Sequence, residues 1–252
     1  MKFFEMTWPE LRKVERNRTV VLLPIAACEQ HSRHLPTFTD SILCGAVADG
    51  VEAKLPRQVL QLPLLWLGAS DHHLPFGATL TVNLDTHITM LCEILTPLLG
   101  DGFTRVLILN GHGGNIDPLH VALRTLQPRY KEALLTGASY WELAEREIAA
   151  LCEGPRKSVG HACEVETSMV MHLRPDLVRT GEIKDDLETV PDALRGLFIA
   201  KDMGQRTDHG AVGYPERASG DKGRRLLEAI VNRVAEVVEG LLRELLPRKV
   251  EH

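Results

Sequence analysis

The chain has 252 residues, of which 44% are hydrophobic and 25% are charged, and its net charge is −5 at pH 7. This is the composition of a globular protein that can bury a sizeable core, and we expect one domain over residues 1–252. The acidic balance argues against nucleic acid as a partner, and no apolar stretch reaches the roughly 20 residues that cross a bilayer. We therefore predict a cytoplasmic protein that has no membrane partner.

Apolar runs of strand length alternate with stretches of helical periodicity along the chain. We expect strands at 20–27, 59–67, 106–109 and 133–136, and helices at 41–54, 85–99, 118–126, 140–153, 164–173 and from 221 to about 246. The alternation favours an α/β fold with a mostly parallel sheet, in which ligands gather at the carboxyl ends of the strands. Residues 184–214 are less regular and predict a long excursion that could form a lid.

The five cysteines are odd in number and form no C-x-x-C pair, so they predict reduced and mostly buried thiols. A thiol hydrolase that uses Cys28 or Cys163 is a weak alternative, because the residues around both cysteines suit a metal ion better. The histidines are more informative, since six of them lie beside glycines, prolines or acids at expected strand ends or loops. These six are His31, His34, His72, His73, His112 and His161.

The first candidate motif is CEQHSRHLPTFTD, residues 28–40, directly after the first apolar run. Glu29 and His31 stand two apart at a strand end, so both side chains point to one face and could share an ion. With 34 acids and 11 histidines in 252 residues, a stretch of twelve holds roughly two by composition, whereas residues 29–40 hold four. The excess is modest, and both a metal site and an ordinary polar loop stay open.

The second motif is RVLILNGHGGN, residues 105–115, in which a short apolar strand leads into three glycines. The glycines allow a close approach of the backbone, and His112 projects at the carboxyl end of the strand. A phosphate cradle is disfavoured, because neither G-x-x-x-x-G-K-[ST] nor G-x-G-x-x-G is present. A histidine offered to a metal ion fits the pattern better.

The third motif is GHACEVETS, residues 160–168, at the start of an expected helix. His161 precedes the helix, and Glu164 and Glu166 lie in its first turn. The helix dipole favours an acidic first turn, so this motif alone requires no function, and its spacing does not separate the two glutamates. Together the three motifs offer imidazole and carboxylate groups without thiolates, which suit zinc, manganese or iron(II) in a catalytic site.

The segments E-x-H-x8-D, N-G-H-G-G-N and H-A-x-x-x-E-T-S, in this order, resemble the creatininase (creatinine amidohydrolase) family, with a fainter match at 210–215. The resemblance implies a three-layer α/β/α fold and a homo-oligomer, for which a hexamer is common in the family. It also implies two divalent metal ions, Zn(II) or Mn(II) or both, with Fe(II) as a further option. The implied metal ligands are Glu29, His31, Asp40 as the bridge between the ions, His112 and Glu166.

The resemblance selects Glu166 over Glu164, because Gly114 stands where creatinine-cleaving members carry a glutamate ligand. Lys157 occupies the position of an aromatic lid in those members, so creatinine itself is not the expected substrate. The implied catalytic residues are His161, which contacts substrate or moves a proton, and Glu166. The candidate substrate-binding residues are Ser70, Asp71, His72, Gly113, Gly114, Asn115 and Lys157.

The implied activity is that of a metal-dependent hydrolase with a small-molecule substrate. Metal-activated water would attack the carbonyl of a small cyclic amide or a related substrate at its C–N bond. One alternative is hydrolysis of a C–C bond that opens a cyclic keto-polyol of the inosose type. An alternative of another class is a non-catalytic module whose glycine-rich loop binds a ligand.

Overall fold

A four-stranded sheet forms the centre of the protein in the computed structural model, which describes residues 1–188, 192–194 and 196–247. Its strands are β1 (Val20–Ile25), β2 (Val59–Gln61), β3 (Arg105–Asn110) and β4 (Leu134–Ser139), in the order β2-β1-β3-β4. Every pairing of neighbouring strands is parallel. The carboxyl ends of β1 and β3 therefore meet at one edge of the sheet, where Ile25 pairs with Asn110.

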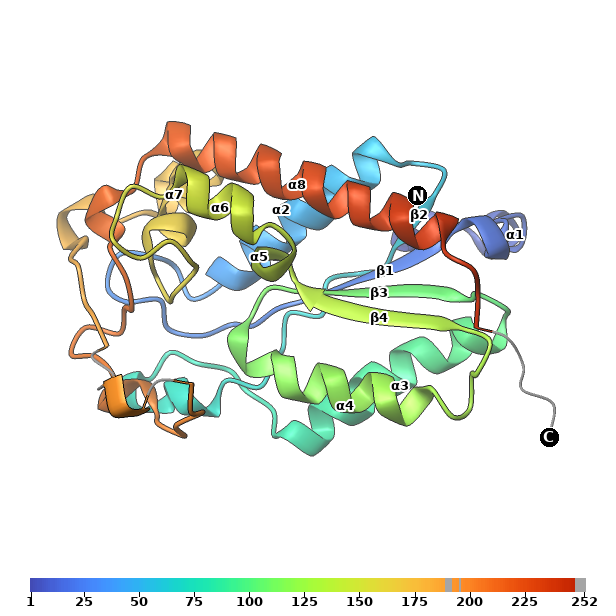
Figure 1. The fold of residues 1–252 in the computed structure, drawn as a ribbon, viewed down its shortest axis with the longest axis horizontal. Helices are drawn as coiled ribbons and strands as arrows, with labels where there is room; N and C mark the ends of the chain where they lie inside the picture. The colour runs from blue at the N-terminus through green and yellow to red at the C-terminus, as the bar shows by residue number, and fades with distance from the viewer. Residues whose placement is uncertain (189–191, 195, 248–252) are drawn as a thin grey trace.

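Helices cover both faces of this sheet, which confirms the expected three-layer α/β/α fold (Figure 1). One face carries α3 (Leu84–Gly100) and α4 (Ile116–Leu126). The other face carries the longer set, namely α2 (Thr39–Lys54), α5 (Tyr140–Leu143), α6 (Glu145–Leu151), α7 (Glu164–Leu173) and α8 (Gly220–Arg243). A short helix, α1 (Trp8–Arg12), precedes β1.

Strand β1 is apolar at every position because each of its faces meets a helical layer. Val20 and Leu22 pack toward α2, α7 and α8, whereas Val21 and Leu23 pack toward α3 and α4. Successive side chains of a strand point to opposite faces, so a strand covered on both sides cannot alternate with polar residues. This burial explains why the run from residue 20 predicted a strand so clearly.

Two elements differ from the sequence expectation. The strand expected at 59–67 ends at Gln61, because Pro63 has no N–H to donate to a ladder, and only Leu65 bridges again to β1. The helix expected at 140–153 divides into α5 and α6 at Ala144, whose φ of −109° and ψ of 28° leave the helical range. Both changes shorten elements without altering the topology.

The chain after α7 follows the expectation of a long irregular segment and a final packing helix. The described part of 184–214 holds only short 3-10 turns and isolated bridges, while residues 189–191 and 195 lie outside the described structure. Helix α8 then buries Leu226, Ile230 and Val234 against α2 and α7. Across the residues described, no helix is both long and apolar enough to cross a bilayer.

Helix α3 carries a buried histidine that makes the stability of the protein depend on pH. His87 is fully buried, and burial lowers its pKa to about 4, whereas an unfolded histidine has a pKa of about 6.5. Between these values the unfolded state binds more protons, so the free energy of unfolding falls as the pH drops from 6.5 to 4.

We expect His87→Leu to flatten this dependence by on the order of 2 kcal/mol across that window. Urea unfolding at several pH values would measure the slope. His120→Gln, on the exposed face of α4, should keep the slope of the parent. Parallel slopes for the parent and His87→Leu would contradict the prediction.

Candidate metal centre

The three sequence motifs meet at the carboxyl edge of the sheet. Glu29 and His31 lie in the loop after β1, and Asp40 lies in the first turn of α2. His112 follows β3, where the absence of a side chain at Gly111 leaves room for Cys44, only 2.6 Å from where a Cβ would stand. The third motif joins them through α7, which packs against α2 and α8.

Asp40 lies between two groups of potential ligands. Its Oδ1 is 3.0 Å from His31 Nε2, and its Oδ2 is 3.1 Å from His112 Nδ1. One of these groups consists of Glu29, Asp40 and His112, and the other of His31, Asp40 and Glu166, with ligand atoms within 4.8 Å of one another in each. A third group, which does not include Asp40, joins Glu29, His31 and His161. The sharing of Asp40 suits a carboxylate that contacts two neighbouring cations.

The two glutamates of the third motif have separate environments. Glu166 points to His31 and Asp40. Glu164 instead accepts hydrogen bonds from the backbone N–H groups of Glu153 and Gly154 and from Lys222 Nζ at 2.5 Å. Glu164 therefore fastens the loop before His161 to α8, and Glu166 alone of the pair faces the cluster.

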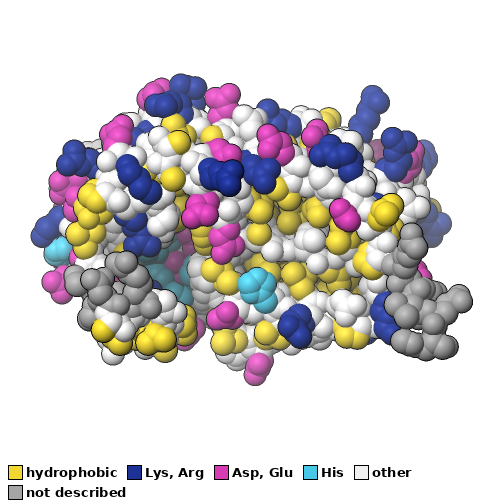
Figure 2. Space-filling model, in the orientation of Figure 1, with side chains coloured by type: hydrophobic (Ala, Val, Ile, Leu, Met, Phe, Trp, Pro, Cys, Tyr) yellow, Lys and Arg dark blue, Asp and Glu magenta, His cyan; other side chains and the backbone are white. Residues whose placement is uncertain are grey.

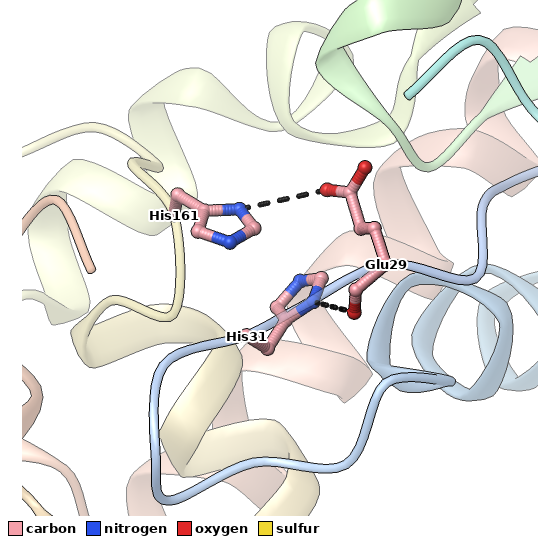
Figure 3. Close-up of side chains that lie close together, drawn as sticks. All are labelled: Glu29, His31 and His161. Carbon is pink, nitrogen blue, oxygen red and sulfur yellow. Dashed lines mark hydrogen bonds and ion pairs between the residues drawn. The ribbon is translucent and has the colours of Figure 1, made fainter. Parts of the chain in front are cut away.

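The histidines of the cluster are oriented through their outer ring nitrogens. His31 Nδ1 is 3.2 Å from the Glu29 carbonyl, His112 Nε2 is 3.0 Å from the Ala69 carbonyl, and His161 Nε2 is 2.8 Å from the Gln30 carbonyl. A carbonyl can only accept, so each of these nitrogens carries a proton, and the other ring nitrogen faces inward, where a metal ion could take the place of its proton. Figure 3 shows His31 and His161 beside Glu29 in this arrangement. Backbone support of this kind is typical of metal-binding histidines.

His73 has the opposite orientation, and sequence analysis did not assign it to the centre. Gln30 Oε1 accepts from the N–H of Ser32, which turns its amide nitrogen toward His73 Nδ1 at 2.9 Å. The proton of His73 therefore sits on Nε2, 3.2 Å from Glu29 Oε1. His73 therefore makes a close electrostatic contact with Glu29 from the side of the cavity. The only sequence signal for it was the polar pair of histidines at 72–73.

The electrostatics of the cluster are those of a cation site. Burial alone would lower the pKa of His31, but the Asp40 carboxylate, with Glu166 and Glu29, raises it to about 9. His112 likewise has a raised pKa because Glu29 and Asp40 outweigh its burial. Burial raises the pKa of Glu166 to about 7. In the metal-free protein, protons bound to these side chains thus neutralise the negative charge of the carboxylates. A bound cation would take over that role.

Buried polar atoms without hydrogen-bond partners point inward at the same place. They are both carboxylate oxygens of Glu29, Oδ2 of Asp40 and Nε2 of His31. Such atoms are rare in native proteins, because each one costs desolvation free energy without a compensating bond. Carboxylate oxygens and imidazole nitrogens are the donors that Zn(II) and Mn(II) accept, so these residues fit divalent metal ions.

A cavity of about 290 Å³ opens over the cluster. Figure 2 shows histidine and acidic side chains recessed in a hollow on this face. Of the predicted substrate-binding residues, His72 and Gly113 line the cavity, as does His161. A larger hollow of about 940 Å³ lies at the opposite edge of the sheet, where β1 and β2 begin. Trp141 also lines the cavity, and lining residues that sequence analysis did not single out for the site include Arg156, Glu188, Met203 and Arg206.

Three of the other predicted substrate-binding residues, Ser70, Gly114 and Asn115, lie behind the centre and are not among the residues that line the cavity. Ser70 is fully buried behind His112, with its Oγ 3.2 Å from His112 Nε2. Asn115 donates to the Ala26 carbonyl and accepts from the N–H of Ala69, so it joins β1 to the neighbouring loop. Gly114 is packed against the Ala69 carbonyl.

Two further predicted substrate-binding residues, Asp71 and Lys157, are not among the residues that line the cavity. Asp71 is exposed at the start of a 3-10 turn. Lys157 donates from Nζ to the Cys152 carbonyl at 2.6 Å, while its neighbour Arg156 lines the cavity. The thiol alternative also lacks support, because burial raises the pKa of Cys163 to about 12 and leaves the thiol protonated.

Two residues beside the cluster adopt left-handed backbone conformations without being glycine. Ser32 has a φ of 58° and follows His31, and Ala162 has a φ of 47° and follows His161. Such conformations cost roughly 1 kcal/mol or more each and are retained where surrounding contacts fix them. Here the turns after both histidines set the direction from which the rings enter the site.

The sequence profile described as "Creatininase: Creatinine amidohydrolase" matches residues 4–238. The chain therefore belongs to the creatininase family of hydrolases. It is 27% identical over 240 residues to the mycofactocin precursor peptide peptidase of Mycobacterium ulcerans, covering 90% of this chain and 83% of that protein. It is also 27% identical to the creatinine amidohydrolase of Pseudomonas putida, covering 93% and 94%.

Solved structures agree with this membership. A crystal structure of creatininase shares 26% identity at a TM-score of 0.81, covering 96% of this chain and 98% of the other. A structure described as "Creatininase Mn" aligns with a TM-score of 0.81, 26% identity and coverage of 96% and 99%. A "Zn-Zn type" structure of a creatininase mutant aligns with a TM-score of 0.81, 25% identity and coverage of 96% and 98%.

The glycine loop allows a paired test of how tightly the centre is packed. A Cβ at Gly114 would overlap the Ala69 carbonyl and stand 2.9 Å from His72 Cε1, whereas nothing lies within 4 Å of a Cβ at Gly113. We expect Gly114→Ala to lower the free energy of unfolding by about 1–3 kcal/mol. Gly113→Ala should change it by less than about 0.5 kcal/mol.

Chemical denaturation of both variants would measure the difference. Equal stabilities for the two variants would show that the loop is looser than this packing implies.

Proposed function

We propose that this protein is a hydrolase that uses two divalent metal ions to cleave an amide C–N bond. The single observation that supports this most strongly is the position of Asp40 between the two ligand groups. Under this proposal Glu29 and His112 hold one ion, His31 and Glu166 hold the other, and Asp40 contacts both. When bound, the ions would lower the pKa of a water to about 7 and polarise the substrate carbonyl.

His161 is the residue proposed to move the proton. Its outer nitrogen is engaged by the Gln30 carbonyl, so its Nδ1 faces the cavity, 3.7 Å from Glu29 Oε1. Burial, together with the nearby charge of His31, lowers the pKa of His161 well below its usual value, which keeps this nitrogen free to accept a proton. From there the proton can pass to the departing nitrogen, a step worth roughly 10²–10⁴-fold in typical enzymes.

Two differences between this chain and the creatinine-cleaving members of the family argue for a substrate other than creatinine. Gly114 replaces a glutamate, and Lys157, at the position of the aromatic lid, faces the Cys152 carbonyl instead of the cavity. Similar proteins are described as a peptide peptidase, as a creatinine amidohydrolase and, at 24% identity over 180 residues, as the 3-dehydro-scyllo-inosose hydrolase of Thermotoga maritima. That last match covers 70% of this chain and 57% of the inosose hydrolase. Two of the three descriptions concern C–N bonds, which favours an amide or peptide substrate.

Metal analysis tests the centre directly. We expect about two equivalents of Zn(II) or Mn(II) per chain in the parent, and a loss of more than about 100-fold in metal affinity for Asp40→Asn. The loss follows because removing the shared charge affects both ions. Asp85→Asn, an exposed acid in the first turn of α3, is the matched control and should retain the parent's metal content.

A parent that folds but binds no divalent ion after dialysis against Zn(II) or Mn(II) would refute the proposal. Assays with lactams, formamides, short peptides and keto-inositols would then identify the bond that is cleaved. Turnover of the keto-inositol alone would replace the amide assignment with C–C hydrolysis.

A further inference from the structure

The cavity over the proposed metal centre has an uneven distribution of charge. Its floor holds carboxylates and histidines, and much of its wall is apolar. Arg156 and Arg206 also line it, from the loop before α7 and from the turn after Met203. The apolar wall consists of Ile116, Trp141, Val159, Met203 and Val212.

Among the residues that the structure describes, Arg206 has no partner for its charge. The side chain is half-buried, and its Nε is a buried donor without a hydrogen-bond partner there, whereas buried donors normally bond to an acceptor. Within the described ranges no carboxylate forms an ion pair with Arg156 or Arg206. Glu188 also lines the cavity, but its Oε1 lies 3.5 Å from Lys201 Nζ, so the charge of Glu188 is already balanced.

Arg206 is also held in a defined place. The 3-10 turn that precedes it, Met203–Gln205, packs against the turn Asp71–Phe76, which carries His72 and His73. Met203 is 2% exposed, and it anchors the turn at the cavity wall. A guanidinium carried by such a packed turn beside a cavity is well placed to bind a carboxylate group, because its N–H groups match the two carboxylate oxygens.

The charge balance favours the same kind of ligand. Two divalent ions would be balanced by Glu29, Asp40 and Glu166 together with the hydroxide that the ions generate from water, so the positive charge left in the cavity is that of the two arginines. An uncharged substrate would leave Arg206 without a counter-ion once it covered the cavity. A substrate with one carboxylate would satisfy Arg206 and place its apolar part against Trp141.

We propose that the substrate carries a carboxylate beyond the scissile amide and that Arg206 binds it, as in an N-acyl amino acid or a short peptide with a free carboxyl terminus. Arg156 adds a second positive charge to the same cavity. This inference rests on the proposed metal-dependent hydrolase function. It identifies Arg206 as the residue that determines specificity.

Matched pairs of metal-chelating probes test the inference without requiring turnover. The probes are the monohydroxamates of succinic and glutaric acids and the uncharged carboxamide analogue of each, titrated calorimetrically into the metal-loaded protein. In the parent we expect the acid to bind more tightly than its carboxamide by about tenfold or more for at least one chain length. Arg206→Gln should remove this preference while both probes still bind.

Arg206→Lys should keep part of the preference, because it retains the charge without the planar geometry. Arg225→Gln, which removes an exposed charge from α8, is the matched control and should bind as the parent does. The inference is overturned if the parent shows no preference at either length, or if Arg206→Gln retains it. Those results would leave the metal centre intact, whereas failure of every hydroxamate to bind would refute the proposed function as well.

Discussion

The burial of three carboxylates in one place is the constraint on which this structure depends. Glu29, Asp40 and Glu166 are each at most 4% exposed and come from two motifs that lie far apart in the chain, 28–40 and 160–168. Like charges at such close range repel strongly in a medium that excludes water, so the fold must supply positive charge or protons to balance them. The surrounding imidazoles do so in part, and the same demand suits the cluster to the binding of cations.

The fold and the position of the cluster follow from sequence features with clear physical causes. The strands are apolar on both faces, and parallel strands bring their carboxyl ends together, so the loops holding Glu29 and His112 had to become neighbours. The choice between Glu164 and Glu166 lay beyond such reasoning. Residues two apart on a helix point about 200° apart, and only tertiary contacts decide which of them faces α2 and which faces Lys222.

The cavity wall was the least predictable part. Arg206 and His73 come from 3-10 turns and irregular chain, where no periodic pattern indicates the direction of a side chain. Ser70 and Asn115 were expected to bind substrate, yet Ser70 contacts the ring of His112 and Asn115 holds the backbone behind the centre. A polar residue near an active site can face the ligand or satisfy buried main-chain groups, and the sequence gives no means of separating these roles.

The left-handed turns at Ser32 and Ala162 bear on how this enzyme family can be stabilised. Both positions would accept glycine without conformational penalty, so they are natural targets for raising thermal tolerance. Glycine would also widen the range of backbone angles available next to His31 and His161. Glycine at these two positions would therefore stabilise the fold but leave the imidazole rings less precisely oriented. A gain in thermal stability would come with a less rigid reaction centre.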